Sequence, residues 1–123
     1  MSLWRKKAID YLPELKTEIE SSENHMQLWI ELQSYLSFSY TDKNKQDLIK
    51  RIFDYAKWCY YDSKNTDLVT SLIVAFYEHL PLDKKICDEL DKWIDKKQFN
   101  DLKEVFKYHS TEMQFKDLEK KYL

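Results

Sequence analysis

The sequence predicts an all-α protein that forms a single domain over residues 1–123, with about six antiparallel helices. The chain contains no glycine, whereas the tight turns of β-hairpins favour pairs such as Asn-Gly, Asp-Gly or Gly-X. Apolar residues also recur at the three- and four-residue spacing of a helix in each stretch between polar breaks. Because these breaks are short, consecutive helices should be antiparallel neighbours. We therefore expect a stack of helical hairpins, with an up-and-down bundle as the alternative.

The first half of the chain carries three helical stripes. The first extends over residues 4–19, and Pro13 inside it predicts a kink or the start of a second helix. The second stripe occupies residues 28–36, after a polar segment at 21–24. The third occupies residues 48–59. Each has the amphipathic pattern of a helix with one face in the core.

The second half carries three more stripes. The fourth helix follows a polar segment in which Asn65 or Thr66 can cap its first turn. Its residues 72–77 are apolar on nearly every side, which predicts a central, enclosed helix. The fifth stripe covers residues 86–94, and a sixth helix is predicted to begin at an Asn100 cap. The apolar side of that sixth helix would comprise Leu102, Val105, Phe106, His109 and Met113.

Composition excludes several functional classes. Without glycine the chain has no phosphate-binding loop, no dinucleotide fingerprint and no G-x-S-x-G nucleophile elbow, since each of these depends on glycine. A net charge of −2, a pI of about 5.9 and only two arginines disfavour nucleic-acid binding. The longest apolar run, residues 72–77, is far shorter than the roughly 20 residues of a membrane-spanning helix. We expect no nucleic-acid partner and no membrane association.

The cysteines and the N-terminus indicate a cytoplasmic protein. Cys59 and Cys87 lie far apart and form no C-x-x-C pair, which is typical of reduced, buried thiols. Asp10 and Glu14 interrupt the segment that would have to be the apolar core of a signal peptide.

The histidines do not follow a metal-binding pattern. None of His25, His79 and His109 has a glutamate three residues before it, as carboxylate di-iron bundles require, and H-E-x-x-H is absent. A zinc site from Cys59, Cys87, His79 and His109 would need the fold to bring four separated ligands together. We predict no metal and no cofactor.

Glu78 and His79 are adjacent at the end of the fourth helix. At about 100° per residue, His79 shares the buried arc of Phe76 while Glu78 points elsewhere, so the two should not form a dyad with each other. His79 is therefore predicted to pack against the helix end. In the functional alternative, Glu78 or His79 lines a pocket with Tyr77, and Glu78 pairs with Arg51 or a tyrosine hydroxyl.

Aromatic side chains make up 15% of the chain and concentrate in residues 53–62. They spread around the predicted third helix, so some should face solvent, a groove or a partner. Exposed aromatic clusters often mark interaction surfaces, which makes Trp58 and Tyr61 candidate partner-binding residues. In the alternative interpretation the tyrosines only bridge core and water.

Two segments carry a likeness to a known group of proteins. With Tyr55-Ala56-Lys57-Trp58 in one helix and Phe76-Tyr77-Glu78-His79-Leu80 closing the next, the sequence resembles a family of small, uncharacterised all-helical bacterial proteins. The likeness covers mainly residues 29–80. It implies a helical fold and a bacterial cytosolic setting, and it brings no established reaction or cofactor.

The leading functional hypothesis is a non-enzymatic helical interaction domain that binds a partner protein, for example as an immunity-type or accessory protein. Its candidate partner-binding or pocket residues are Trp58, Tyr61, Tyr77, Glu78 and His79. One alternative is a small-molecule or metal-dependent enzyme with a pocket near Glu78, His79 and Trp58. The other is a structural homo-oligomer, in which the partner is a second copy of the chain.

Overall fold

The computed structural model describes residues 1–40, 42 and 45–123, and within these ranges every regular element is helical. The elements in chain order are α1 (Leu3–Tyr11), the 3₁₀ turn η1 (Pro13–Leu15), α2 (Lys16–Ser21), α3 (His25–Ser39), α4 (Gln46–Lys57), the π-helical turn η3 (Trp58–Asp62), α5 (Thr66–Ala75), the 3₁₀ segment η4 (Tyr77–Leu82), α6 (Lys84–Asp88), α7 (Leu90–Trp93), α8 (Lys96–Asp101), α9 (Lys103–Tyr108) and α10 (Glu112–Lys120). The all-α prediction is confirmed.

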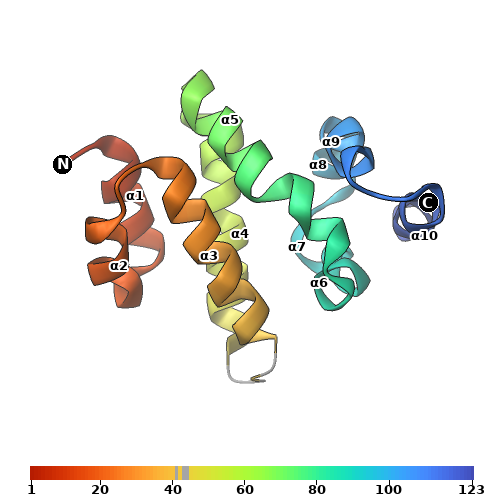
Figure 1. Ribbon diagram of the computed structural model, residues 1–123, viewed down its shortest axis with the longest axis horizontal. Helices are drawn as coiled ribbons and strands as arrows, with labels where there is room; N and C mark the ends of the chain where they lie inside the picture. The colour runs from red at the N-terminus through yellow and green to blue at the C-terminus, as the bar shows by residue number, and fades with distance from the viewer. Residues whose placement is uncertain (41, 43–44) are drawn as a thin grey trace.

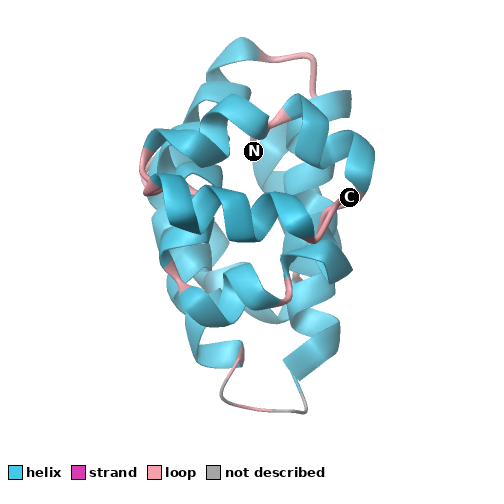
Figure 2. Ribbon diagram, turned by 90° about the vertical axis from the view of Figure 1, so that its right-hand side faces the viewer, coloured by secondary structure: helices cyan, strands magenta, loops and turns pink. Residues whose placement is uncertain are grey.

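The helices follow one another along the long axis of the molecule (Figure 1). The α1–α2 hairpin lies at one end, the long helices α3 and α4 lie in the middle, and the short helices α6 to α10 lie at the other end. Within this arrangement α4 packs against α1 and α3, and α5 packs against α3. Figure 2 shows that the connections drawn in pink are short, as expected for neighbouring antiparallel elements.

Large aromatic side chains fill the centre of the core. Trp29 on α3 lies 5.4 Å from Tyr55 on α4 and 4.7 Å from Phe76, measured between ring centroids, and all three are fully buried. Such ring pairs add to the stability that the burial of their apolar area already provides. The middle of the molecule is therefore held together across three elements that are distant in sequence.

The turn between α4 and α5 is built without glycine. The Ser63 N–H donates to the Trp58 carbonyl oxygen at 3.0 Å, which closes the π-helical turn. Lys64 then adopts a positive φ of 52°, a conformation that glycine normally supplies. Asn65 caps α5 by accepting from the Asp67 and Leu68 N–H groups at 3.0 and 3.3 Å. The predicted cap is confirmed.

The fourth predicted helix ends earlier than its apolar pattern suggests. The α-helix stops at Ala75, and η4 continues as a 3₁₀ segment that contains Pro81. Proline lacks an N–H and clashes with the carbonyl four residues before it in an α-helix, so a continuous helix through Tyr77 is disfavoured. The 100° rotation used to place Glu78 and His79 therefore does not apply beyond Ala75, although His79 is half-buried at the rim of the core.

The last two predicted helices are divided. The fifth stripe forms α6 and α7, and the sixth is divided among the end of α8, α9 and the start of α10. The predicted cap at Asn100 is wrong, because Asn100 lies inside α8 and Asp95 caps that helix in a reciprocal pair with Gln98. His109 and Met113 are exposed, in contrast to the prediction, because α9 ends before them at Tyr108.

Candidate functional site

Glu78 and His79 both contact His109, which lies about 30 positions further along the chain. Glu78 Oε1 lies 3.6 Å from His109 Nε2, and the His79 ring stacks on the His109 ring at 5.5 Å. The Glu78 side chain is only 13% exposed, whereas that of His109 is 39% exposed. The acid–imidazole pair therefore joins η4 to the residue after α9, and no sequence spacing indicated it.

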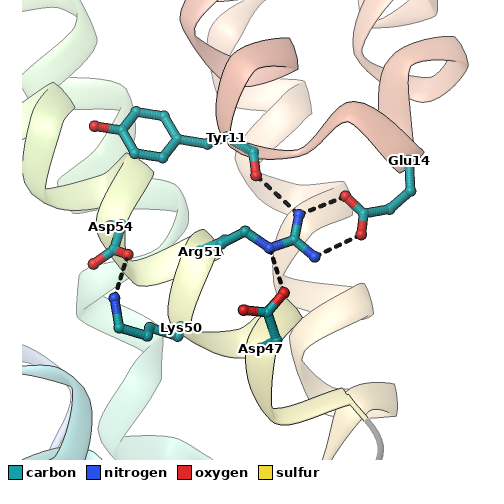
Figure 3. Close-up of polar contacts among 6 residues, drawn as sticks. All are labelled: Tyr11, Glu14, Asp47, Lys50, Arg51 and Asp54. Atoms are coloured by element: carbon teal, nitrogen blue, oxygen red, sulfur yellow. Dashed lines mark hydrogen bonds and ion pairs between the residues drawn. The ribbon is translucent and has the colours of Figure 1, made fainter.

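Arg51 is not the partner of Glu78. Its guanidinium donates two hydrogen bonds of 2.6 Å to the Glu14 carboxylate, one of 2.8 Å to Asp47, and one of 3.0 Å to the Tyr11 carbonyl oxygen (Figure 3). These bonds tie α4 to the turn after α1. The hydrogen bonds from Arg51 lower the pKa of the Glu14 carboxyl.

The other predicted site residues lie apart. Tyr77 belongs to the core, and the half-buried Trp58 stacks on Tyr55 with 6.2 Å between the rings. The Tyr61 hydroxyl donates to Asp101 at 2.6 Å, and burial together with this bond raises the pKa of Tyr61. His79 lines a depression of about 500 Å³ with two lysines of the α6 segment, Lys84 and Lys85. The five residues thus form no common pocket.

A larger open groove, of about 720 Å³, lies where the N-terminal ends of α3 and α5 meet the first turn of α1. We call it the α3–α5 groove. Its apolar lining includes Trp4, Met26, Ile30 and Leu68, and its polar lining includes Glu23, Asn24, His25, Asn65 and Asp67. Ile30 is 56% exposed although it is a large aliphatic residue on a central helix.

Local hydrogen bonds hold the walls of this groove in place. Asn24 accepts from the Gln27 N–H at 2.9 Å, and the Gln27 side chain accepts from the Glu23 N–H at 2.8 Å, so the start of α3 is capped from both sides. Arg5 donates to the carbonyl oxygens of Ile19 and Ser22 at 2.6 and 2.5 Å. This bond pair fixes α1 to the end of α2 and so positions Trp4, the residue before Arg5, at the groove.

The groove carries two carboxylates, Glu23 and Asp67. Both residues are exposed, and neither side chain has an ion-pair partner among the residues that the structure describes. Asp67 lies in the first turn of α5, where a negative charge is favoured by the helix dipole. The groove is therefore apolar and negatively charged.

His25 forms part of the groove lining and is 5% exposed. Its Nε2 lies 3.2 Å from Trp29 Nε1, 3.2 Å from the Tyr55 hydroxyl and 3.7 Å from Cys59 Sγ. Burial lowers the pKa of His25 to about 4 and raises the pKa of Cys59 to about 12, so both groups are neutral near pH 7. This polar cluster inside an aromatic core was not predicted from the sequence, because its members come from positions 25 to 59.

Most of the chain matches a known protein family. The sequence profile of a domain of unknown function, DUF7674, matches residues 5–107. The chain belongs to the DUF7674 family. The predicted resemblance to an uncharacterised all-helical family is confirmed. No curated protein and no solved structure matches the chain.

The DUF7674 match extends from Arg5 on α1 to Lys107 on α9. It therefore includes every residue that lines the groove except Trp4. Helix α10 lies beyond the matched residues. Family membership supplies no reaction, ligand or partner. The chemistry of the site must be argued from its residues.

Two further properties of this DUF7674 chain bear on that chemistry. In the described ranges, no group of three or more histidine, cysteine, aspartate or glutamate side chains is arranged to hold a metal ion. Cys59 contacts His25 in the core, whereas the sequence analysis considered it beside His79 and His109. Across the same ranges no helix is both long and apolar enough to span a bilayer.

Proposed function

We propose that this DUF7674 chain is a non-enzymatic protein-interaction domain, and that the α3–α5 groove is its docking surface. The partner is a protein segment that carries apolar and cationic side chains. The observation that carries the proposal is the combination of an open apolar groove with two carboxylates that have no ion-pair partner in the described part of the chain.

The apolar part of the groove supports the docking of a segment. Ile30 and Met26 are 56% and 38% exposed on adjacent turns of α3, beside the half-buried Trp4. Covering a large aliphatic side chain stabilises a complex by about 1.5–3 kcal/mol. Grooves between helices with apolar side chains at their floor bind partner segments in this way.

The charge of the groove selects the type of segment. An acidic partner segment would be repelled by Glu23 and Asp67, whereas lysine or arginine side chains would be attracted. Complementary charge speeds association and suppresses wrong partners. Because both carboxylates are exposed, their attraction is screened by salt, and binding should weaken as ionic strength rises.

An immunity-type or accessory protein that blocks its partner would act through a surface of this kind. We propose this role by analogy with other small helical proteins. The cytoplasm is the compartment that we propose, because Cys59 and Cys87 are both free thiols. Neither point is needed for the docking proposal.

Site-specific photo-cross-linking tests the proposal. A photoreactive residue in place of Ile30 should attach to one segment of a partner protein, and mass spectrometry should show lysine or arginine among apolar residues in that segment. The matched control carries the same group at Met113, which is 74% exposed on α10 and lies outside the groove. Equal cross-linking from both positions, or an acidic attached segment, would contradict the proposal. Attachment to a second copy of the chain would favour the homo-oligomer instead.

The Glu78–His109 pair favours a second candidate, a small-molecule enzyme. A carboxylate beside an imidazole can act as a general base or orient one, and the 3.6 Å separation lies close to that arrangement. Incubating the protein with a mixture of cellular metabolites should then deplete one compound, as measured by mass spectrometry. The His109→Gln variant should abolish the depletion. An unchanged mixture would remove this candidate.

A further inference from the structure

The tautomer of His25 follows from its indole neighbour. Trp29 Nε1 lies 3.2 Å from His25 Nε2, and an indole nitrogen can only donate. Nε2 must therefore be an unprotonated acceptor. Because burial also keeps the ring neutral, its single proton resides on Nδ1.

That proton has no acceptor in the described part of the chain. Nδ1 of His25 is buried and has no hydrogen-bond partner among the described residues. Nδ1 and Nε2 point in different directions from the imidazole ring, and Nε2 faces Trp29, Tyr55 and Cys59. Buried donors in native proteins are nearly always paired, so an orphaned N–H indicates an acceptor from outside the described residues.

The location of the ring indicates where such an acceptor comes from. His25 lines the α3–α5 groove and is the first residue of α3. A groove occupant that presents a carbonyl oxygen at this end would therefore meet the donor of the ring.

Trp4 is a ring neighbour of His25 at the groove. Its ring lies 5.0 Å from the imidazole ring, between centroids, and it also lines the groove. Trp4 is half-buried on the first turn of α1, close to the chain terminus, whereas His25 is enclosed by the core. Since Nδ1 is buried, an acceptor can reach it only if a neighbouring side chain moves, and Trp4 is a half-buried neighbour that lines the groove.

We propose that His25 Nδ1–H is a recognition donor of the α3–α5 groove, which binds a backbone carbonyl oxygen of the partner segment once the Trp4 ring is displaced. This inference rests on the proposed function, since it assigns a contact to the same groove. It adds a specific requirement: the occupant must supply an acceptor oxygen beside its apolar and cationic side chains.

Nuclear magnetic resonance of ¹⁵N-histidine-labelled protein tests this contact directly. The probe is the blocked tripeptide acetyl-Leu-Lys-Leu-amide, added to the full chain at millimolar concentrations. The Nδ1-bound proton of His25 should move downfield, and the methyl signals of Met26 and Ile30 should shift with the same saturation curve. A Trp4→Leu variant should bind the peptide more tightly and exchange this proton with solvent faster. Acetyl-Leu-Glu-Leu-amide is the matched control and should bind more weakly.

The outcomes separate the two proposals. Shifts of Met26 and Ile30 without a change at Nδ1 would overturn the role of His25 and leave the groove as a docking surface, with an internal water as the acceptor of the buried proton. Equal binding by wild type and Trp4→Leu would also overturn it. If neither peptide shifts any groove signal, the assigned contact with a backbone carbonyl is wrong, while docking itself is judged by the cross-linking at Ile30.

Discussion

The two halves of the molecule hold their histidines in opposite environments. In the N-terminal half, α3 and α4 are 15 and 12 residues long and enclose His25 among aromatic rings. In the C-terminal half, helices of four to six residues and the 3₁₀ segment η4 leave His79 half-buried and His109 exposed.

The difference has consequences for charge and recognition. The buried imidazole resists protonation and keeps an unpaired donor, while the exposed one can pair with Glu78 and with solvent. An unmet donor next to a groove is a stronger indication of a binding contact than an imidazole that already contacts a carboxylate. The comparison therefore directs attention to the α3–α5 groove, and the following predictions test it from the largest effect to the smallest.

Acid should destabilise the protein through His25. Its pKa is lowered in the folded state, from 6.5 to about 4. Between pH 6.5 and 4, His25 is therefore protonated in the unfolded chain but neutral in the folded protein. Stability is complete above pH 6.5 and falls by roughly 3 kcal/mol as the pH drops to about 4. Urea denaturation at several pH values measures it.

The matched variants for this titration are His25→Gln and His109→Gln. The first should lose most of the extra pH dependence between pH 6.5 and 4, and the second should retain it. Identical pH slopes in wild type and His25→Gln would show that His25 is not a buried neutral group, and the contrast between the two halves would fail.

His79→Ala should lower the free energy of unfolding by about 1 kcal/mol, because it trims a half-buried ring that stacks on another ring. His109→Ala should change it by less, since that side chain is mostly solvated. Denaturant titration at pH 7 compares the two. A loss of more than about 3 kcal/mol of unfolding free energy from either variant would show that the contacts among Glu78, His79 and His109 stabilise the fold as much as those around His25.

Glu14→Gln should reduce stability by about 1 kcal/mol at low salt and by less at high salt, since it breaks a partly exposed bidentate pair with Arg51. The pKa of Glu14 is lower in the folded protein than in the unfolded chain. The pair with Arg51 therefore stabilises the fold fully above the unfolded-state pKa of Glu14, and this stabilisation is lost as the pH falls through its folded-state pKa. Glu20→Gln, in the longer 3.7 Å surface pair with Lys16, is the control. Equal losses from both variants would contradict the structural role of Arg51.

Lys64→Gly should stabilise the protein by roughly 0.5–1 kcal/mol, because a lysine with a φ of 52° is strained where glycine is not. Lys57→Gly is the control, since Lys57 has a helical φ of −61° and should lose about 1 kcal/mol on the same change. Thermal melting of both variants checks the sign. Destabilisation by both would show that Lys64 is not held in the left-handed region.

The sequence predicted the elements whose signals are local. Pro13 divides the first helical stripe and Asn65 caps α5, as their local chemistry requires. The break after Ala75 was missed because apolar periodicity continues through it, while Pro81 acts on the backbone several residues upstream. The cap at Asp95 was missed because it depends on the reciprocal bond with Gln98 rather than on the more obvious Asn100.

The candidate site could not be predicted in the same way. The groove joins Trp4, His25 and Asp67, which carry no common spacing and are brought together only by the packing of α1, α3 and α5. The aromatic residues of segment 53–62 are buried or half-buried in several separate contacts. Partner binding by Trp58 and Tyr61 stays a prediction.

The most direct test of the docking proposal is the affinity of the cross-linked partner segment for three proteins, measured by isothermal titration calorimetry. Ile30→Glu should weaken binding by roughly 10-fold or more, because it removes the burial of a side chain that is 56% exposed in the free chain, about 1–2 kcal/mol, and adds a third negative charge to the groove. Met113→Glu should bind like the wild type, and circular dichroism should show that all three remain helical. Unchanged affinity in Ile30→Glu, or an equal loss in Met113→Glu, would show that the α3–α5 groove is not the docking surface.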